Sequence, residues 1–236
     1  MTLREINWAR WYDTTAGGIG HLEHAYSPAR CLDVLAEHLP RGNGVRVLEL
    51  GCAPGRWLGW AAMRLGVVPV GLELDPDGVR LTRAQFPTIP LTRADAFHLP
   101  FSDRSFDAVY SIGLIEHFED PSGIIREAWR VLRPGGTSVW FIPNLEPGSF
   151  ARWHWRTFHR KVFEAHRAYT ISDLATLIAG AGFTIVHREH SGLYLPHFQR
   201  VLGRLPLRGL LRRLEHPKVT SNLAVVGRRD GHSLAR

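Results

Sequence analysis

The sequence predicts an α/β protein: a Rossmann-like, doubly wound sheet of seven strands, mostly parallel with an antiparallel last strand, and with α-helices on both faces. Two observations favour this fold. Short apolar segments alternate with stretches of helical spacing, and the first apolar segment runs into a small-residue turn followed by a helix. The expected strands are residues 45–50, 67–74, 89–93, 105–112, 139–144, 182–186 and 223–227, with the last at the sheet edge. Helices are expected near residues 28–39, 58–65, 124–132 and 173–181.

The turn after the first expected strand is the strongest local signal. Gly51, Ala53 and Gly55 are separated by single residues, so the backbone can turn sharply and its N–H groups can approach a ligand. A strand, such a turn and a helix N-terminus together form a site for a nucleotide-like ligand. A dinucleotide fingerprint would need a third glycine at Arg56, and Glu49 before the turn suits a cationic ligand better than a pyrophosphate.

A second acidic residue, Glu73, stands at the end of the next expected strand. Ligands of open parallel sheets lie beyond the carboxyl ends of the strands, so we expect Glu73 to face the same crevice. A carboxylate there can accept hydrogen bonds from both hydroxyls of a ribose. Asp75 is the competing candidate, although Asp75-Pro76-Asp77-Gly78 is also typical of a turn and helix cap.

Composition indicates a soluble globular protein: 44 % of the 236 residues are hydrophobic and 22 % are charged. No apolar run is long enough to span a membrane, and residues 4–13 lack the apolar core of a signal peptide. Two cysteines, Cys31 and Cys52, indicate a reducing cytoplasm. The net charge of +7 is concentrated in residues 152–167 and 200–218, which predicts either a solvated basic face or attraction for an acidic substrate, an anionic membrane or RNA.

Three further motifs lie at set separations from the turn: Phe-Asp-Ala-Val-Tyr-Ser at 106–111, Ile-Glu-His-Phe at 115–118 and Val-Leu-Arg-Pro-Gly-Gly at 131–136. With Glu-x-Gly-x-Ala-x-Gly, the acidic strand end and Asp95, the pattern over residues 44–186 resembles the class I S-adenosylmethionine-dependent methyltransferases, in their small-molecule branch. Ala53 replaces the usual middle glycine of that motif. The chain has no Asn-Pro-Pro-Tyr or Pro-Cys after the fourth strand, which counts against methylation of DNA bases.

The resemblance implies that S-adenosylmethionine is the cofactor and S-adenosylhomocysteine the product. By position, Asp95 would accept a hydrogen bond from the adenine amine, the N–H of Ala96 would meet a ring nitrogen, and Phe97 would pack on the base. Cys52 fits a small space-filling residue better than a nucleophile. The expected cofactor-binding residues are Glu49, Gly51, Cys52, Ala53, Gly55, Glu73, Leu74, Asp95, Ala96, Phe97, Ser111 and Ile112.

Two segments outside these motifs are expected to form the acceptor site. Residues 1–44 are interpreted as an N-terminal helical flap, and residues 45–236 as the methyltransferase domain. An insertion at about 145–168 is expected to act as a substrate lid, and a basic segment follows at about 193–218. The expected substrate-binding residues are Trp8, Trp11, Tyr12, Trp153 and Phe158, although ordinary packing explains the N-terminal aromatic residues equally well.

Histidines supply the candidate catalytic residues, namely His117, His154 and His159. A structural or cofactor-facing role is favoured for His117, because relatives with many different substrates share Glu-His at this place. No metal is expected, because His154, His159 and His166 lack a supporting carboxylate or cysteine pattern.

The predicted function is methyl transfer by in-line displacement to a small molecule or short peptide, with oxygen as the default acceptor atom and nitrogen or sulfur left open. The alternatives are an RNA-modifying methyltransferase and a non-catalytic nucleoside-binding regulator. Nucleic acid is not the expected partner, and the protein is expected to be a monomer or homodimer in the cytoplasm.

Overall fold

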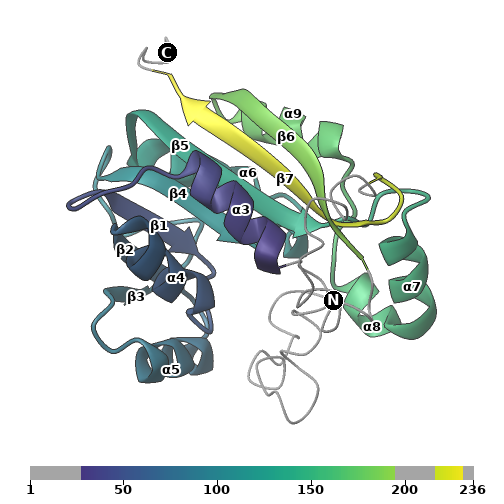
Figure 1. Ribbon diagram of the computed structural model, residues 1–236, viewed down its shortest axis with the longest axis horizontal. Helices are drawn as coiled ribbons and strands as arrows, with labels where there is room; N and C mark the ends of the chain where they lie inside the picture. The colour runs from purple at the N-terminus through teal and green to yellow at the C-terminus, as the bar shows by residue number, and fades with distance from the viewer. Residues whose placement is uncertain (1–27, 195–215, 231–236) are drawn as a thin grey trace.

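The computed structural model describes residues 28–194 and 216–230, and a seven-stranded sheet forms its centre (Figure 1). The strands are β1 Arg46–Leu50, β2 Val68–Glu73, β3 Leu91–Arg93, β4 Phe106–Ile112, β5 Leu132–Pro143, β6 Phe183–Leu193 and β7 Thr220–Arg229. The helices are α3 Pro28–His38, α4 Arg56–Leu65, α5 Pro76–Gln85, the 3-10 turn η2 Ile115–His117, α6 Ser122–Val131, α7 Phe150–Phe158, α8 Arg160–Glu164 and α9 Ile171–Gly180.

The strand order is β3-β2-β1-β4-β5-β7-β6, and β1 to β5 pair in parallel. Strand β7 pairs antiparallel with both β5 and β6, so the predicted fold class, a mostly parallel sheet with an antiparallel last strand, is confirmed. The expectation that the last strand lies at the edge is wrong, because β7 lies between β5 and β6. Nine of its ten residues are buried, as a strand with a neighbour on each side requires, and β6 forms the edge.

Helices cover both faces of the sheet because successive strand residues point to opposite sides. Leu48 and Leu50 of β1 pack with buried side chains of α6 and α9. Val47, which precedes Leu48, points to the other face and packs with buried side chains of α3 and α4. In Figure 1, α3 crosses the face of the sheet that is turned toward the viewer. The two clusters of side chains form the apolar core that holds the strand ends in place.

One element begins earlier than expected. Strand β5 starts at Leu132 instead of residue 139, directly after α6 ends at Val131. The helix ends just before the Arg-Pro-Gly-Gly stretch, as expected, but that stretch is already part of the extended strand. Its pairing with β4 is interrupted between the pairs Phe106↔Leu132 and Ala108↔Thr137. The other expected strands begin within three residues of the observed starts.

Some expectations lie outside the described residues: Trp8, Trp11 and Tyr12, and most of the basic segment at 193–218. Helix α3 belongs to the range interpreted as a flap, yet it buries Cys31 and Leu35 in the core. The domain boundary at residue 44 stays a prediction. Within the described part of the chain, no helix is long and apolar enough to cross a membrane.

Candidate functional site

The turn between β1 and α4 is built from glycines that no other residue replaces without strain. Gly51 and Gly55 have φ values of 68° and 92°, in the left-handed region. A Cβ on Gly55 would lie 2.8 Å from side-chain atoms of Phe86 and Thr82. The N–H of Gly51 and that of Cys52 both donate to the Leu72 carbonyl of β2, which holds the turn beyond the carboxyl edge of the sheet.

Glu73, the last residue of β2, points its carboxylate into this turn. Its oxygens accept hydrogen bonds from the backbone N–H groups of Ala53 at 3.2 Å, Leu74 at 2.8 Å and Asp75 at 3.0 Å. Burial raises the pKa of the Glu73 carboxyl, and the three N–H donors oppose that shift. Asp75 instead caps α5 and accepts a hydrogen bond from Gly78 N at 2.8 Å, so the two competing acids face different partners.

Glu49 lies one residue before the end of β1 and is buried. Tyr110, its neighbour in register on β4, donates a hydrogen bond to the Glu49 carboxylate at 2.8 Å. Burial raises the pKa of Glu49 well above its ordinary value, and the nearby Glu73 adds to the shift. A positive charge placed beside these two acids would stabilise their ionised forms.

Asp95 follows β3 and borders an open cavity of about 470 Å³, which is lined by Asp95, Phe97, His98, Gly123, Arg126 and Glu127. Its carboxylate accepts a hydrogen bond from Phe97 N at 2.9 Å. The ring of Phe97 lies edge-on to Phe118, with centroids 5.1 Å apart. An acid and an aromatic ring therefore flank the cavity, which suits a base that offers an amine and a flat face.

The other expected cofactor residues differ in how far they are buried. Cys52 and Ala96 are buried, and a Cβ on Gly71 would lie 2.7 Å from Cys52 Sγ, so this thiol fills space under the turn. Ser111 is buried and donates to the Leu50 carbonyl at 3.3 Å, Ile112 is partly buried, and Leu74 is exposed. Their contact with a cofactor stays a prediction, as do the roles of Glu49, Glu73 and Asp95.

These residues together fit a cationic nucleoside. The acids come from three adjacent strands, β1, β2 and β3, at the edge where a glycine turn exposes backbone next to a helix N-terminus. Carboxylates can accept hydrogen bonds from ribose hydroxyls and an adenine amine and can balance a positive charge.

Each candidate catalytic histidine contacts an identified neighbour in the structure. His117 Nδ1 lies 3.0 Å from the Ala165 carbonyl, and burial lowers its pKa to about 4. His154 Nδ1 lies 2.9 Å from the Tyr194 hydroxyl, which also accepts a hydrogen bond from Trp155 Nε1 at 2.7 Å. The ring of His159 lies 5.1 Å from that of His154. His117 packs against His166, whose ring lies 5.1 Å from that of Trp155, and the catalytic roles of all three candidate histidines stay predictions.

The structure groups His166 with His117 and Glu116, and the expectation that no metal binds stays a prediction. His166 packs against His117, with ring centroids 4.3 Å apart, and Glu116 lies close to both. The carboxylate that the sequence pattern lacked therefore comes from η2, about fifty residues before His166. Hydrogen bonds between segment 165–167 and η2 help to bring these residues together, and no local spacing in the sequence indicates the cluster.

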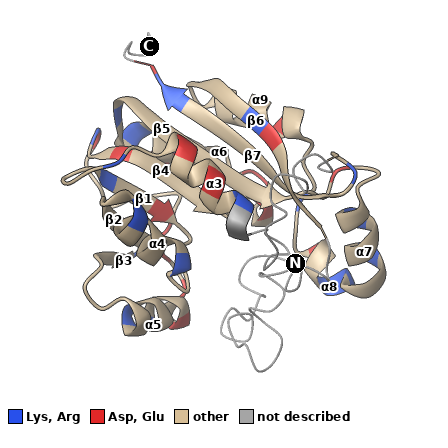
Figure 2. Cartoon of the chain, in the orientation of Figure 1, with Lys and Arg blue, Asp and Glu red and all other residues tan. Residues whose placement is uncertain are grey.

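The insertion at 145–168 forms α7 and α8, which carry Lys and Arg along both helices (Figure 2). Trp153 and Phe158 of α7 are 55 % and 62 % exposed, and their rings meet edge-on at 5.9 Å. Two large aromatic side chains open to solvent on one short helix form an apolar surface of the kind that takes a ligand. Substrate binding by these residues stays a prediction.

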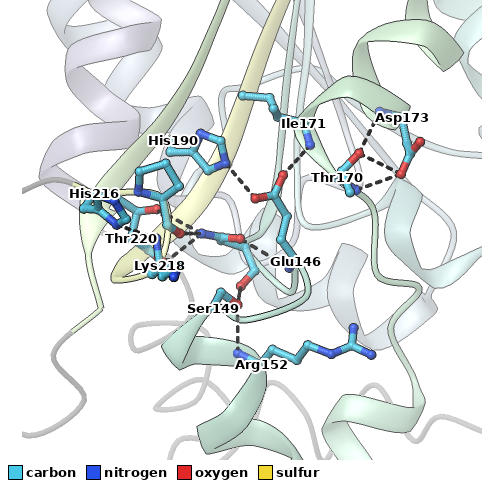
Figure 3. A network of polar contacts seen from close by, with 12 residues as sticks. Glu146, Ser149, Arg152, Thr170, Ile171, Asp173, His190, His216, Lys218 and Thr220 are labelled. Atoms are coloured by element: carbon cyan, nitrogen blue, oxygen red, sulfur yellow. Dashed lines mark hydrogen bonds and ion pairs between the residues drawn. The ribbon is translucent and has the colours of Figure 1, made fainter.

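A polar network that the sequence did not indicate anchors the start of the insertion (Figure 3). Glu146 accepts a hydrogen bond from Ile171 N at 2.6 Å, and its second oxygen lies 2.8 Å from His190 Nε2. Asn144 donates to Thr220 Oγ1 at 2.9 Å, and Ser149 donates to the Asn144 carbonyl. The network joins the end of β5 to α9, β6 and β7, so α7 starts from a fixed position.

Comparison with known proteins agrees with this architecture. Residues 48–140 match the model of a methyltransferase domain family. The chain is 33 % identical to the methyltransferase GfsG of Streptomyces halstedii over 45 % of this chain and 41 % of that protein. It is 34 % identical to the ubiquinone biosynthesis O-methyltransferase of Xanthomonas campestris over 60 % of this chain and 59 % of that protein.

The alignments thus span roughly half the length of these relatives. Among solved structures, a SAM-dependent methyltransferase of Thermotoga maritima, described as a possible histamine N-methyltransferase, superposes with a TM-score of 0.66 and 20 % identity, over 95 % of this chain and all of that one. That likeness bears on the fold alone. The glycine turn, the acidic strand ends, the sheet order and the matched residues agree with one another: residues 48–140 match a methyltransferase domain, and the chain is similar to the class I S-adenosylmethionine-dependent methyltransferases.

Proposed function

We propose that this protein transfers a methyl group from S-adenosylmethionine to an oxygen atom of a small molecule or short peptide. The observation that carries the proposal is that Glu73, Asp95 and the glycine turn lie at the same carboxyl edge of the sheet, where Glu73 bonds the turn and Asp95 borders a cavity of about 470 Å³. The O-methyltransferase named among the relatives supports oxygen as the acceptor atom.

The residues at this edge would share the work of holding the cofactor, whose sulfonium supplies an already activated methyl group. Glu73 would accept a hydrogen bond from the ribose and Asp95 one from the adenine amine. Glu49 would balance the positive charge from beneath the turn, with Tyr110 holding its carboxylate in place. Because the donor is activated, the protein contributes mainly alignment, which can supply about 7–11 kcal/mol of a barrier.

The acceptor would bind on the insertion side of the site. Trp153 and Phe158 offer an exposed apolar surface there, and His154 lies 5.1 Å from the Phe158 ring. We assign proton removal from the acceptor hydroxyl to His154 or His159. The low pKa of His117, about 4, makes that residue a weaker proton acceptor.

RNA modification is the second candidate, and the basic insertion is what favours it. Its Arg side chains, however, have partners inside the protein. Arg160 pairs with Glu164, Arg152 donates to the Leu145 carbonyl, and Arg167 donates to the Glu119 carbonyl. Because these arginine side chains already have partners, their contacts support a small-molecule acceptor.

The state of the two cysteines bears on location. Both are free and buried, which supports a cytoplasmic location.

The test measures methyl transfer from a labelled donor to a panel of phenols, alcohols, amines and short peptides, with RNA as a separate arm. Trp153→Ala is expected to lower kcat/KM for the acceptor at least about tenfold and to leave S-adenosylhomocysteine affinity unchanged. Met63→Ala is the matched control, because Met63 is 77 % exposed on α4, away from the insertion.

Methylation of RNA alone, with affinity falling steeply between 50 and 200 mM salt, would replace the small-molecule assignment with RNA modification. Tight S-adenosylhomocysteine binding with no labelled product from any acceptor would favour a non-catalytic regulator. Equal acceptor kinetics in Trp153→Ala and Met63→Ala would remove α7 from the acceptor site.

A further inference from the structure

Glu116, His117 and His166 bring three potential metal ligands together. One ligand atom from each residue lies within 4.8 Å of the other two. Glu116 is buried and both imidazoles are partly buried, so the cluster is shielded but reachable from solvent. Within residues 28–194 and 216–230 this is the one group of His, Cys, Asp or Glu side chains that meets this spacing.

Both imidazoles place Nδ1 against a backbone carbonyl oxygen. His117 Nδ1 lies 3.0 Å from the Ala165 carbonyl, and His166 Nδ1 lies 2.6 Å from the Val162 carbonyl. A carbonyl oxygen can only accept, so Nδ1 carries the proton and, in a neutral ring, Nε2 carries the lone pair. Histidine ligands of metals commonly donate the other ring N–H to a carbonyl in this way, which fixes the tautomer and the ring plane.

We propose that Glu116, His117 and His166 bind a divalent transition-metal ion of the Zn²⁺ or Fe²⁺ type. Two imidazoles and one carboxylate are the donor set that such ions prefer, whereas Mg²⁺ and Ca²⁺ favour oxygen ligands throughout. Bonds of about 2.0–2.2 Å place tetrahedral donors about 3.4 Å apart, so binding requires the present separations, all within 4.8 Å, to shorten by no more than about 1.4 Å. Water would complete the coordination.

The ion would join two segments that are distant in the sequence. Glu116 and His117 belong to η2, just after β4, and His166 follows α8 of the insertion. The two segments already touch, because Arg167 N donates to the Glu116 carbonyl at 2.6 Å and the Arg167 side chain donates to the Glu119 carbonyl at 2.8 Å. The ligands are therefore held close before binding, and an ion bound by the folded chain alone would stabilise it.

The test uses the full-length chain without a histidine tag, stripped with a chelator. Titration with Co²⁺ followed by visible absorption, and with Zn²⁺ followed by calorimetry and thermal unfolding, is expected to show one ion per chain and a higher Tm. His166→Ala and the near-isosteric Glu116→Gln are each expected to weaken binding at least about tenfold. His187→Ala is the matched control, because that ring contacts His38 and Glu189 on another part of the sheet and should bind as the wild type does.

The proposal is wrong if stripped wild-type protein shows no Co²⁺ bands and no Zn²⁺-dependent rise in Tm. It is equally wrong if His166→Ala and Glu116→Gln, folded by circular dichroism, bind the ions as tightly as His187→Ala. These readouts need no methyl acceptor, so a failure of the methyl-transfer assay would leave the metal result standing.

Discussion

Replacing Glu73 with alanine is the most direct perturbation of the proposed cofactor site. A carboxylate has about four lone-pair positions, and three of those on Glu73 already accept N–H groups of Ala53, Leu74 and Asp75. One position, on the oxygen that faces Ala53, is left for a ribose hydroxyl. Accepting both hydroxyls would require release of the 3.2 Å bond from Ala53, so we count one hydrogen bond to the ligand.

The expected loss follows from that count. A hydrogen bond to a charged group contributes about 1.5–3 kcal/mol, and each 1.4 kcal/mol is a factor of ten. Glu73→Ala should therefore weaken S-adenosylhomocysteine binding about 10- to 140-fold. Calorimetry on the full-length chain measures this affinity. Thermal unfolding of the same samples is needed, because the alanine also removes the acceptor of three backbone N–H groups.

Asp75→Ala provides the matched control two residues away. It removes the cap bond to Gly78 N, so it should cost about 1 kcal/mol of unfolding free energy while leaving ligand affinity within about twofold. Unchanged ligand affinity in a folded Glu73→Ala variant would refute the reasoning. A tenfold loss of affinity in Asp75→Ala would show that the competing acid holds the ribose.

Two further substitutions test the buried charges. Burial raises the pKa of Glu49 above its value in the unfolded chain, so the wild-type free energy of unfolding should fall as pH rises from the ordinary glutamate range toward that raised pKa. Urea titrations over pH should show Glu49→Gln gaining stability relative to wild type along this rise, and a pH-independent difference would contradict this. Arg229 donates to the carbonyls of Trp129, Arg130 and Leu132 and lies 3.6 Å from the Trp129 ring centroid. Arg229→Met should lower the free energy of unfolding by about 2–4 kcal/mol, Arg229→Lys should lower it less, and equal stability of the two variants would count against the assigned contacts.

Local patterns predicted much of the fold. The Gly51–Gly55 turn and the Asp75 cap each lie within a few residues of sequence, and the structure forms both. Such features depend on backbone sterics and on side chains that bond their own turn, so neighbouring residues suffice to indicate them. The acids at the strand ends could be predicted for a second reason: parallel strands end at one carboxyl edge of the sheet.

Pairing between distant segments is what the pattern did not contain. The near-continuous burial of β7 is compatible with an edge covered on both faces or with an inner strand, and only its hydrogen bonds to both β5 and β6 place it inside. The Glu146–His190 contact and the Glu116–His117–His166 cluster likewise join residues about fifty positions apart, which no periodicity records.

The sequence by itself determined the order of elements, the glycine turn and the acids at the ends of adjacent strands, because these depend on short-range conformational preference and on which residues are apolar. Tertiary structure alone decided which histidines meet, which strand lies at the edge and where the insertion is anchored. Those outcomes depend on packing between segments that are far apart along the chain, and the residues near each segment in sequence do not determine the energy of that packing.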